Sequence, residues 1–472
     1  MEKINNNLKT KSVLVYDYGL FTEMAVALVK DFKQVFYYVP WQSDFPSSIN
    51  QKIGQDLDGI IRIQNFWDYV DKVDLIVFFD TYSGDLVSYL RSKGYRVWGA
   101  GQAEQMELDR WEMRKAQQEV GLPTQDTLRL KSLQDLTTYF KGIKRRVIEF
   151  TGKHDINFEN AIFNQLKQKY NGFSSDYYTG KNKIKLAKEW FEGAENKFVK
   201  SNMRGDIETF FAPNYDDSLS KFNALSEAFG HRADAKEIEF IVEDSKEGVE
   251  PGFDGIQING EYLSPTMYGY ERKGAGYIGR ILSYQELPQP IQEMNKKLTT
   301  IFQKYLPTAS FFSTEFIIGD DKKPYLIDPT VRNPAPVGSA IFSALIENLG
   351  EVLWYGAEGI RVIPVMKYKY AAGVAFDSEW AENHELEIEF PPALRPWVKF
   401  RKAYKKGDKY YSIPGFTSIL SVIALGNSIP EVINLVEKRA KQVQAYELQT
   451  DTGGLYKCLD EINEGKKYGI NF

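Results

Sequence analysis

The stretch STEFIIGDDKKPYLIDPTVRNPAPVG, which spans Ser313–Gly338, predicts two strands joined by a tight turn. Each strand carries one acidic residue among apolar neighbours, Glu315 in the first strand and Asp328 in the second. Two carboxylates that face each other across a hairpin can hold a hard cation such as Mg²⁺. The alternative is a hairpin whose charges only decorate a solvated face. That alternative would also expose the apolar neighbours to water, so we prefer the metal site.

The bulk composition limits the class of protein. The chain has 472 residues, which is too long for one hydrophobic core and predicts two to four domains. Its net charge of -5 and its lack of a long basic block argue against nucleic-acid binding. The single cysteine, Cys458, excludes a disulfide within the chain and a cysteine-based zinc site, and three histidines argue against a histidine-rich metal site. No segment resembles a signal peptide or a spanning helix, so we expect a soluble cytoplasmic protein that does not bind membranes.

The N-terminal region alternates short apolar strands with amphipathic helices. We expect strands at Ser12–Tyr16, Gln34–Val39, Asp74–Phe79 and Arg96–Trp98, and helices at Leu20–Phe32 and Gly84–Lys93. Continuous apolar strands between helices predict a parallel sheet covered on both faces, which ends near Gly101. The first strand–helix turn, Tyr16–Leu20, lacks the glycine spacing that a pyrophosphate needs, which argues against a dinucleotide dehydrogenase.

The middle and the tail of the chain show different patterns. A helix is expected at Leu108–Val120, where Gly121–Thr124 supplies the stop signal, and the polar stretch Thr151–Glu195 is expected to be an insertion. Two-fold alternation then predicts strands at Lys197–Val199, Glu208–Ala212, Ile238–Val242, Phe253–Ile258, Phe311–Ile318 and Pro324–Ile327, with a helix at Pro290–Tyr305. The tail, from about Lys367, predicts strands at Tyr370–Phe376 and Ser418–Ala424 and a helix at Ile429–Gln444 that Ser428 and Glu431 would cap.

Several local strings resemble the ATP-grasp ligases. VWGAGQAEQMELDRWEMRKAQQEVGLPT (Val97–Thr124) resembles a junction of that family in which an Asp-Arg pair opens a helix, which places Arg110 near the nucleotide phosphates. FVKSNMRGDIETFFAP (Phe198–Pro213) takes the place of the phosphate loop, and the resemblance gives Lys200 a phosphate contact.

Two further strings extend the resemblance. FIVEDSKEGVEPGFDG (Phe240–Gly255) resembles the hinge that pairs with adenine, and this implies Glu243 and Asp244 at the adenine and Glu250 at the ribose hydroxyls. The opening stretch resembles the family's metal-binding strand pair. By that resemblance Glu315 and Asp328 hold Mg²⁺ with help from Thr330, and Arg332 holds the acyl phosphate or the substrate carboxylate. In ERKGAGYIG (Glu271–Gly279), Arg272 corresponds to an anion contact of the substrate loop.

The tail resembles the C-terminal domain of the glycinamide ribonucleotide synthetase (phosphoribosylamine–glycine ligase) family through SILSVIALGNSIPEVINLVEKRAKQVQ (Ser418–Gln444). The resemblance implies a multidomain α/β and α+β protein. The resemblance further implies a Rossmann-like pre-ATP-grasp domain at 1–105, an ATP-grasp domain at 106–366 with an insertion at about 151–195, and a small C-terminal α/β domain at 367–472.

The implied activity is that of an ATP-dependent carboxylate–amine ligase with Mg²⁺, which forms an acyl phosphate and acts on small-molecule substrates as a monomer or homodimer. The substrate loops depart from the family pattern, as in DYGLFTEM (Asp17–Met24), so the acid and the amine stay unnamed. The phosphate loop keeps only Gly205. This loss leaves open an alternative, a degenerate ATP-grasp protein that binds nucleotide or serves as a structural or partner-binding module without ligase activity.

Overall fold

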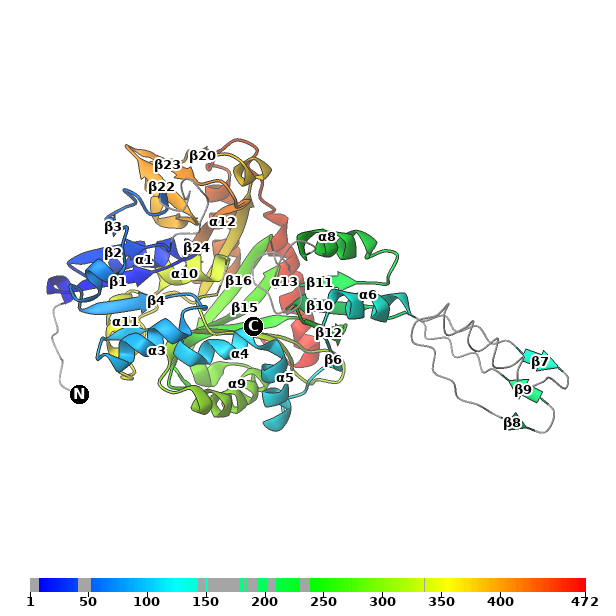
Figure 1. Cartoon of the computed structure of the whole chain (residues 1–472). Coiled ribbons are helices and arrows are strands. Elements are labelled where there is room, and N and C mark those ends of the chain that lie inside the picture. Colours follow the sequence, from blue (N-terminus) through cyan, green and yellow to red (C-terminus); the bar gives the residue numbers. More distant parts are fainter. Residues whose placement is uncertain are drawn as a thin grey trace. The chain divides into compact units, whose positions relative to one another are not determined.

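The computed structural model describes residues 8–40, 52–142, 149–151, 179–180, 183–185, 193–201, 209–229, 238–272, 274–334 and 336–472 (Figure 1). The chain divides into two compact units. We call Met1–Thr124 together with Lys246–Phe472 the main unit, and Gln125–Ser245 the small unit. The three-domain division expected from the sequence stays a prediction.

The main unit begins with a five-stranded parallel sheet (Figure 1). In spatial order its strands are β3 (Ile60–Arg62), β2 (Gln34–Tyr38), β1 (Ser12–Tyr16), β4 (Leu75–Phe78) and β5 (Val97–Trp98). Its helices are α1 (Thr22–Leu28), α2 (Trp67–Val70) and α3 (Gly84–Ser92). Val13 and Val15 join one hydrophobic cluster and Leu14 joins another, so both faces are covered and the predicted parallel sheet is confirmed. The strand order reverses between β1 and β4, and in such sheets ligands bind where the carboxyl ends of those strands meet.

A nine-stranded antiparallel sheet forms the rest of the main unit's framework. Its strands follow the order β18 (Tyr325–Thr330), β17 (Ala309–Ile317), β13 (Pro251–Ile258), β15 (Thr266–Arg272), β16 (Gly276–Leu282), β19 (Tyr370–Asp377), β24 (Ser418–Gly426) and β21 (Val398–Phe400), with β14 (Glu261–Tyr262) beside β13. Helix α13 (Gly453–Gly465) packs on β15 and β16, and α9 (Gln289–Phe302) packs on the same face through Phe302 and Phe312. Strands from the predicted ATP-grasp and C-terminal regions therefore share one sheet.

The remaining elements of the main unit surround these sheets. The helices are α4 (Gln105–Leu108), α5 (Arg110–Glu119), α10 (Val337–Leu345), α11 (Leu349–Gly356) and α12 (Ile429–Ala440), and the strands β20 (Leu386–Ile388), β22 (Ala403–Lys406) and β23 (Lys409–Ser412) form a small antiparallel sheet. Ser428 caps α12 as predicted, because its hydroxyl accepts the N–H of Glu431. Within the described residues, no helix combines the length and apolar composition needed to cross a membrane.

The small unit contains a four-stranded antiparallel sheet. Its order is β11 (Phe210–Ala212), β10 (Lys197–Ser201), β12 (Phe240–Asp244) and β6 (Thr127–Leu130), with helices α6 (Leu133–Lys141) and α8 (Leu219–Phe229). Phe140, Val199, Phe222 and Phe240 form much of its buried core. Most of the predicted insertion lies outside the described residues, and so do residues 202–208 of the stretch that takes the place of the phosphate loop, including Arg204 and Gly205. Two described strands lie within the predicted insertion, β8 (Thr179–Gly180) and β9 (Lys183–Lys185), and β7 (Glu149–Thr151) lies at its start; β9 pairs antiparallel with both.

The structure corrects two expected elements. The helix expected at Leu108–Val120 begins two residues later, at Arg110, because the Asp109 carboxylate accepts the N–H of Glu112 and caps α5. The stretch Glu271–Gly279, expected to be a substrate loop, is instead the end of β15, a turn and the start of β16. Its glycines suggested a loop, whereas Gly276 and Gly279 pair within the sheet.

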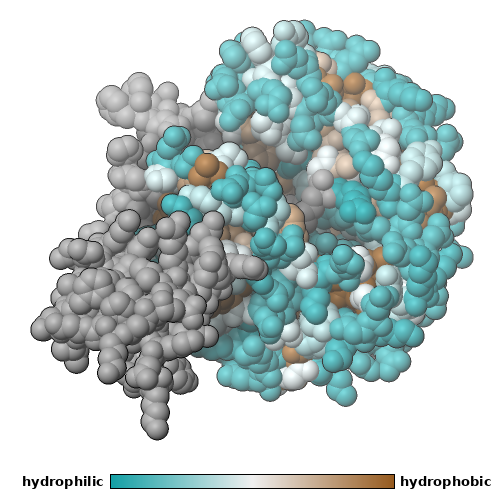
Figure 2. Space-filling view, turned by 90° about the vertical axis from the view of Figure 1, so that its right-hand side faces the viewer, coloured by the Kyte–Doolittle hydropathy of each residue, from teal (hydrophilic) through white to brown (hydrophobic). Residues whose placement is uncertain are grey.

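On the face seen in Figure 2, hydrophilic residues predominate among those shown in colour, and the apolar patches are small.

Candidate active site

The hairpin of β17 and β18 sets two carboxylates opposite each other. The register pairs Glu315 with Asp328 and Ser313 with Thr330, and a β-bulge follows Glu315. Because side chains alternate along a strand, all four point to the same face of the sheet. The opposition of the two carboxylates agrees with the sequence, while their role as metal ligands stays a prediction.

The neighbouring strand β13 adds Asp254 to this face. Asp254 pairs with Ser313 in register, is buried, and accepts hydrogen bonds from Ser313 Oγ (2.6 Å) and Tyr277 Oη (2.5 Å). Burial, with a smaller effect of the nearby Glu315, raises the pKa of Asp254 to about 6, although the hydrogen bonds from Ser313 and Tyr277 act in the opposite direction. Glu250 lies just before β13, two residues ahead of Gly252, the register partner of Glu315.

A groove of two glycines lets Tyr277 reach Asp254. Gly269 and Gly279 are register partners on β15 and β16, on the same face as Asp254. A Cβ atom at Gly269 would lie 2.7 Å from the Tyr277 ring, and one at Gly279 would also lie 2.7 Å from it. The ring therefore lies across positions that have no side chain, and its hydroxyl satisfies a buried carboxyl. No local sequence signal indicates this arrangement, since it depends on the pairing of three strands.

We expect the Asp254→Asn variant to change how stability depends on pH. The pKa of Asp254 in the folded protein lies above its ordinary value of 3.8. The stability that this carboxyl group contributes to the fold is therefore fully present below about pH 4 and is lost as the pH rises through about 6. One pKa unit corresponds to about 1.4 kcal/mol, so the variant should gain about 3 kcal/mol relative to the wild type between about pH 4 and about pH 7. Urea unfolding across this range measures the difference. The equally raised pKa of the buried Asp17 affects both proteins alike. Parallel pH profiles would contradict the prediction.

Arg110 lies beside the carboxylate pair. It is the first residue of α5, and its Nε is 3.8 Å from Asp328 Oδ1. Both side chains are about a third exposed, so the pair is accessible to solvent. A cation next to two carboxylates in an accessible position can contact the phosphates of a bound nucleotide. The structure thus brings Arg110 together with Glu315 and Asp328.

Arg332 is held by two acidic residues that the sequence analysis did not single out. Its Nε lies 2.8 Å from Glu107 Oε1 and 3.6 Å from Asp80 Oδ1. Despite burial, these carboxylates hold the pKa of Arg332 above its ordinary value. The N–H of Asn333 donates to the carbonyl of Phe79, so this cluster lies at the carboxyl end of β4. No local signal links these residues, because they come from distant parts of the chain.

Arg272 does not join this group. It forms an ion pair with Glu461 of α13, and alternation along β15 places it on the face opposite to Gly269 and Asp254. The expectation that Arg272 contacts a substrate anion assumed a loop. The strand directs the side chain to the helix-covered face instead. Residue 273, the Lys beside it, lies outside the described residues.

The small unit holds the other predicted nucleotide contacts. Lys200 and Glu243 lie on the paired strands β10 and β12, with 3.2 Å between Nζ and Oε2, and the two side chains are only 3% and 2% exposed. Thr127 donates a further hydrogen bond to Glu243 Oε1 (3.2 Å). Asp244 pairs with Lys197 and raises the pKa of that lysine. These three predicted residues therefore cluster on neighbouring strands, and their role in nucleotide binding stays a prediction.

The carboxylates of Glu315 and Asp328 are oxygen ligands of the kind that proteins use for Mg²⁺ bound to phosphate groups. Among the residues that the structure describes, no group of three or more His, Cys, Asp or Glu side chains could hold a metal ion. Mg²⁺ at nucleotide sites is bound through one or two carboxylates, while phosphate and water oxygens complete the coordination. Glu315 and Asp328 match that number of protein ligands.

No protein-family model matches the sequence, and no curated protein matches it significantly. The fold, in contrast, is similar to solved enzymes. Phosphoribosylamine–glycine ligase from Thermotoga maritima has a TM-score of 0.62 and 14% identity, over 93% of this chain and 99% of that chain. The biotin carboxylase domain of Hydrogenobacter thermophilus 2-oxoglutarate carboxylase, solved with MgADP and bicarbonate, has a TM-score of 0.57 and 12% identity, over 93% and 91%. L-amino acid ligase from Bacillus licheniformis has a TM-score of 0.53 and 11% identity, over 93% and 98%.

Identities this low establish the fold and leave the reaction to be argued from the site. The similar structures are ATP-grasp enzymes, and their similarity extends over nearly the whole chain. The chain therefore has the fold of the ATP-grasp enzymes, and the resemblance to phosphoribosylamine–glycine ligase that its motifs predict is confirmed at the level of fold.

Proposed function

We propose that this protein is an ATP-dependent carboxylate–amine ligase that acts through an acyl phosphate. One observation carries the proposal: Glu315 and Asp328 lie opposite each other on the β17–β18 hairpin of an ATP-grasp fold, with Arg110 beside them. Two accessible carboxylates next to a cation suit a metal–phosphate group better than they suit a purely structural hairpin.

The reaction would proceed in two displacements. A carboxylate oxygen of the substrate attacks the γ-phosphorus of ATP, the bond to the bridging oxygen breaks, and ADP leaves. The amine nitrogen then attacks the carbonyl carbon, inorganic phosphate leaves, and the nitrogen loses a proton to give the amide. Mg²⁺ would neutralise charge that develops on the phosphates. The protein's main task is to position the reactants and balance their charge.

The proposed roles follow the chemistry of each side chain. Glu315 and Asp328 would hold Mg²⁺, with the Thr330 hydroxyl assisting from the same face. Arg110 and Lys200 would contact phosphates, Glu243 and Asp244 the adenine, and Glu250 the ribose. Arg332 would hold the acyl phosphate or the substrate carboxylate, oriented by Glu107 and Asp80. Arg272 has no role in this scheme, since Glu461 engages it on the other face.

A matrix of carboxylic acids and amines tests the proposal. The wild-type protein is incubated with MgATP and each acid–amine pair, and ADP release is measured. We expect ADP only in wells that contain both a competent acid and a competent amine, with one amide formed per ADP. Thermal stability with and without MgATP is recorded on the same protein, because a ligand that binds only the folded state raises its melting temperature.

The two measurements together separate the proposal from its rival. The glycine-poor phosphate loop favours a degenerate ATP-grasp protein as the second candidate. A thermal shift with MgATP but no ADP release from any pair would support that nucleotide-binding module. No shift at millimolar MgATP would contradict the ligase as well as the nucleotide-binding module.

A further inference from the structure

The β-bulge of the β17–β18 hairpin lies directly beside Asp328. The register passes from the pair Glu315–Asp328 to the pair Phe316–Leu326, so Ile327 is the extra residue on β18. A bulge of this kind bends its strand and changes the direction of the neighbouring side chains. The placement of Asp328 opposite Glu315 therefore depends on how the backbone is held at Ile327.

Arg114 of α5 holds the backbone of β18 at this bulge. Its Nη1 donates to the carbonyl of Leu326 (2.9 Å), and its Nη2 makes a longer contact with the carbonyl of Ile327 (3.4 Å). Nη1 also donates to Gln117 Oε1 (2.5 Å) on the same helix, and Arg114 and Gln117 are only 5% and 1% exposed. A guanidinium presents its N–H donors in a rigid plane, so one side chain can engage two consecutive carbonyls.

The helices α4 and α5 are thus attached to β18 on both sides of Asp328. Arg114 contacts the strand before Asp328, while Glu107 of α4 accepts the N–H of Val331 (2.9 Å) and the Nε of Arg332 (2.8 Å) after it. In the strand order of the described sheet β18 comes last, so no further described strand covers its outer edge. The side chains of these helices, in place of another strand, hold that edge beside the carboxylate.

The same contacts fix the cation of the site. Arg110 lies four positions before Arg114 on α5, so the two side chains project from the same side of the helix. Arg110 Nε is 3.8 Å from Asp328 Oδ1. By joining α5 to β18, Arg114 holds the helix that carries the cation against the strand that carries the carboxylate.

We propose that Arg114 is a positioning residue of the proposed active site. It holds the bulge at Ile327 so that Asp328 faces both Glu315 and Arg110, and in this way it sets the affinity for Mg²⁺ bound to nucleotide phosphates. The inference rests on the proposed function, because it takes Asp328 as a ligand of Mg²⁺. A displacement of about 1 Å at an active site can cost about a hundredfold in rate, so the geometry of one bulge has a large effect.

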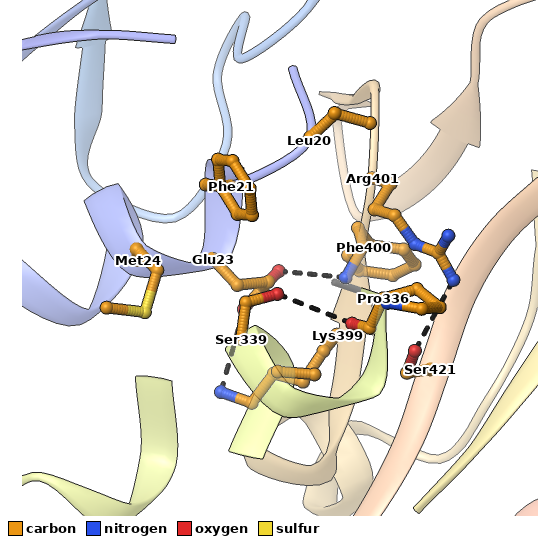
Figure 3. Close-up of a pocket in the computed structure, with 11 residues that line it drawn as sticks. Leu20, Phe21, Glu23, Met24, Pro336, Ser339, Lys399, Phe400, Arg401 and Ser421 are labelled. Carbon is orange, nitrogen blue, oxygen red and sulfur yellow. Dashed lines mark hydrogen bonds and ion pairs between the residues drawn. The ribbon is translucent and has the colours of Figure 1, made fainter. Parts of the chain in front are cut away.

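The alternative is that Arg114 serves only the stability of the fold, and Arg401 provides the matched control. Arg401 is 6% exposed and contacts the carbonyl of Leu420 and Ser421 Oγ at 3.5 Å each; Figure 3 shows it beside Ser421. Both acceptors belong to β24, and five strands separate β24 from β18 in the sheet. Arg401→Met therefore removes a buried guanidinium and leaves the bulge intact.

The experiment measures ATP binding to the full chain by calorimetry, once with excess Mg²⁺ and once with EDTA, at a temperature where every variant is folded. We expect the wild type to bind ATP more tightly with Mg²⁺. Arg114→Met should raise the Kd of MgATP about tenfold and change the Kd of metal-free ATP much less. Arg114→Lys should lie between the two, because an ammonium group keeps the charge and loses the planar pair of donors. Arg401→Met should keep both Kd values, whatever its melting temperature.

A double variant tests whether Arg114 acts through Asp328. In the Asp328→Asn background the carboxylate is already lost, so the further change Arg114→Met should weaken MgATP binding much less than it does in the wild type. A stability effect alone would not produce this dependence on Asp328, because the Kd is measured on folded protein.

Three outcomes would overturn the inference and leave the proposed function standing. These are an unchanged Kd of MgATP in Arg114→Met, an equal loss with Mg²⁺ and with EDTA, and losses for Arg114→Met and Asp328→Asn that multiply in the double variant. If the wild type does not bind MgATP, or if Asp328→Asn binds it as tightly as the wild type, the proposed metal site is wrong and the inference is wrong with it.

Discussion

Glu315→Gln and Asp328→Asn are each expected to remove most of the stabilisation that MgATP gives to the wild type. Each change keeps the size of the side chain and removes one of the two opposed carboxylates, so the metal–phosphate group loses a ligand while the fold is retained. A ligand at 100 times its dissociation constant stabilises a protein by about 2.7 kcal/mol, and a hundredfold loss of affinity would reduce this to about 0.4 kcal/mol. Melting curves with and without MgATP measure the difference.

The same hairpin offers a matched control. Asp320 is an exposed acid in the turn, so Asp320→Asn changes the net charge equally and should keep the full MgATP shift. Chelation of the metal in the wild-type sample should reproduce the behaviour of the two active-site variants. If either variant keeps the wild-type shift, the residue concerned is not a metal ligand and the site has been misplaced.

Glu23→Gln is expected to lower the free energy of unfolding by about 3–5 kcal/mol, the range seen when one member of a buried ion pair is removed. Glu23 is buried and pairs with both Arg395 and Lys399, so its loss removes the carboxylate that Lys399 faces and leaves Arg395 with Asp58. Urea denaturation measures the effect through the midpoint, provided that the slope is unchanged.

A surface pair provides the comparison for Glu23. Glu385 forms an ion pair with Lys52, and both side chains are more than a third exposed. Glu385→Gln should therefore change the unfolding free energy by no more than about 1 kcal/mol. Equal midpoints for Glu23→Gln and Glu385→Gln would mean that the interior tolerates the unbalanced cations.

The sequence predicts features that depend on neighbours within one segment. The opposed Glu315 and Asp328 could be predicted because both strands and their turn lie within one short stretch. Four of the five parallel strands were predicted from short apolar runs, whereas β3 was not predicted, because Ile60–Arg62 holds only two apolar residues. The helix start at Arg110 agrees with the Asp-Arg pair that the sequence resemblance indicated, while the range Leu108–Val120 expected from periodicity began two residues too early.

Features that depend on distant pairing could not be predicted in the same way. The structure does not bring Arg272 to the carboxylate pair, because the face on which it lies is set by the pairing of β15 with β16 and by the packing of α13. Glu23 and Arg395 are separated by 372 positions, so no window of sequence contains both. The stretch Val398–Lys402 did offer a signal, because Lys399 and Arg401 interrupt an apolar strand and charges are rarely buried without a purpose.

The glycine groove beneath Tyr277 also limits how this sequence can change over evolutionary time. Any side chain at 269 or 279 would displace the aromatic ring, and a smaller residue at 277 would take a hydroxyl from the buried Asp254. The four positions are therefore coupled, and substitutions at them are not independent. Most single substitutions at these positions would give a protein with a steric clash or an unsatisfied carboxyl group. We therefore expect related sequences to keep or replace these four residues together.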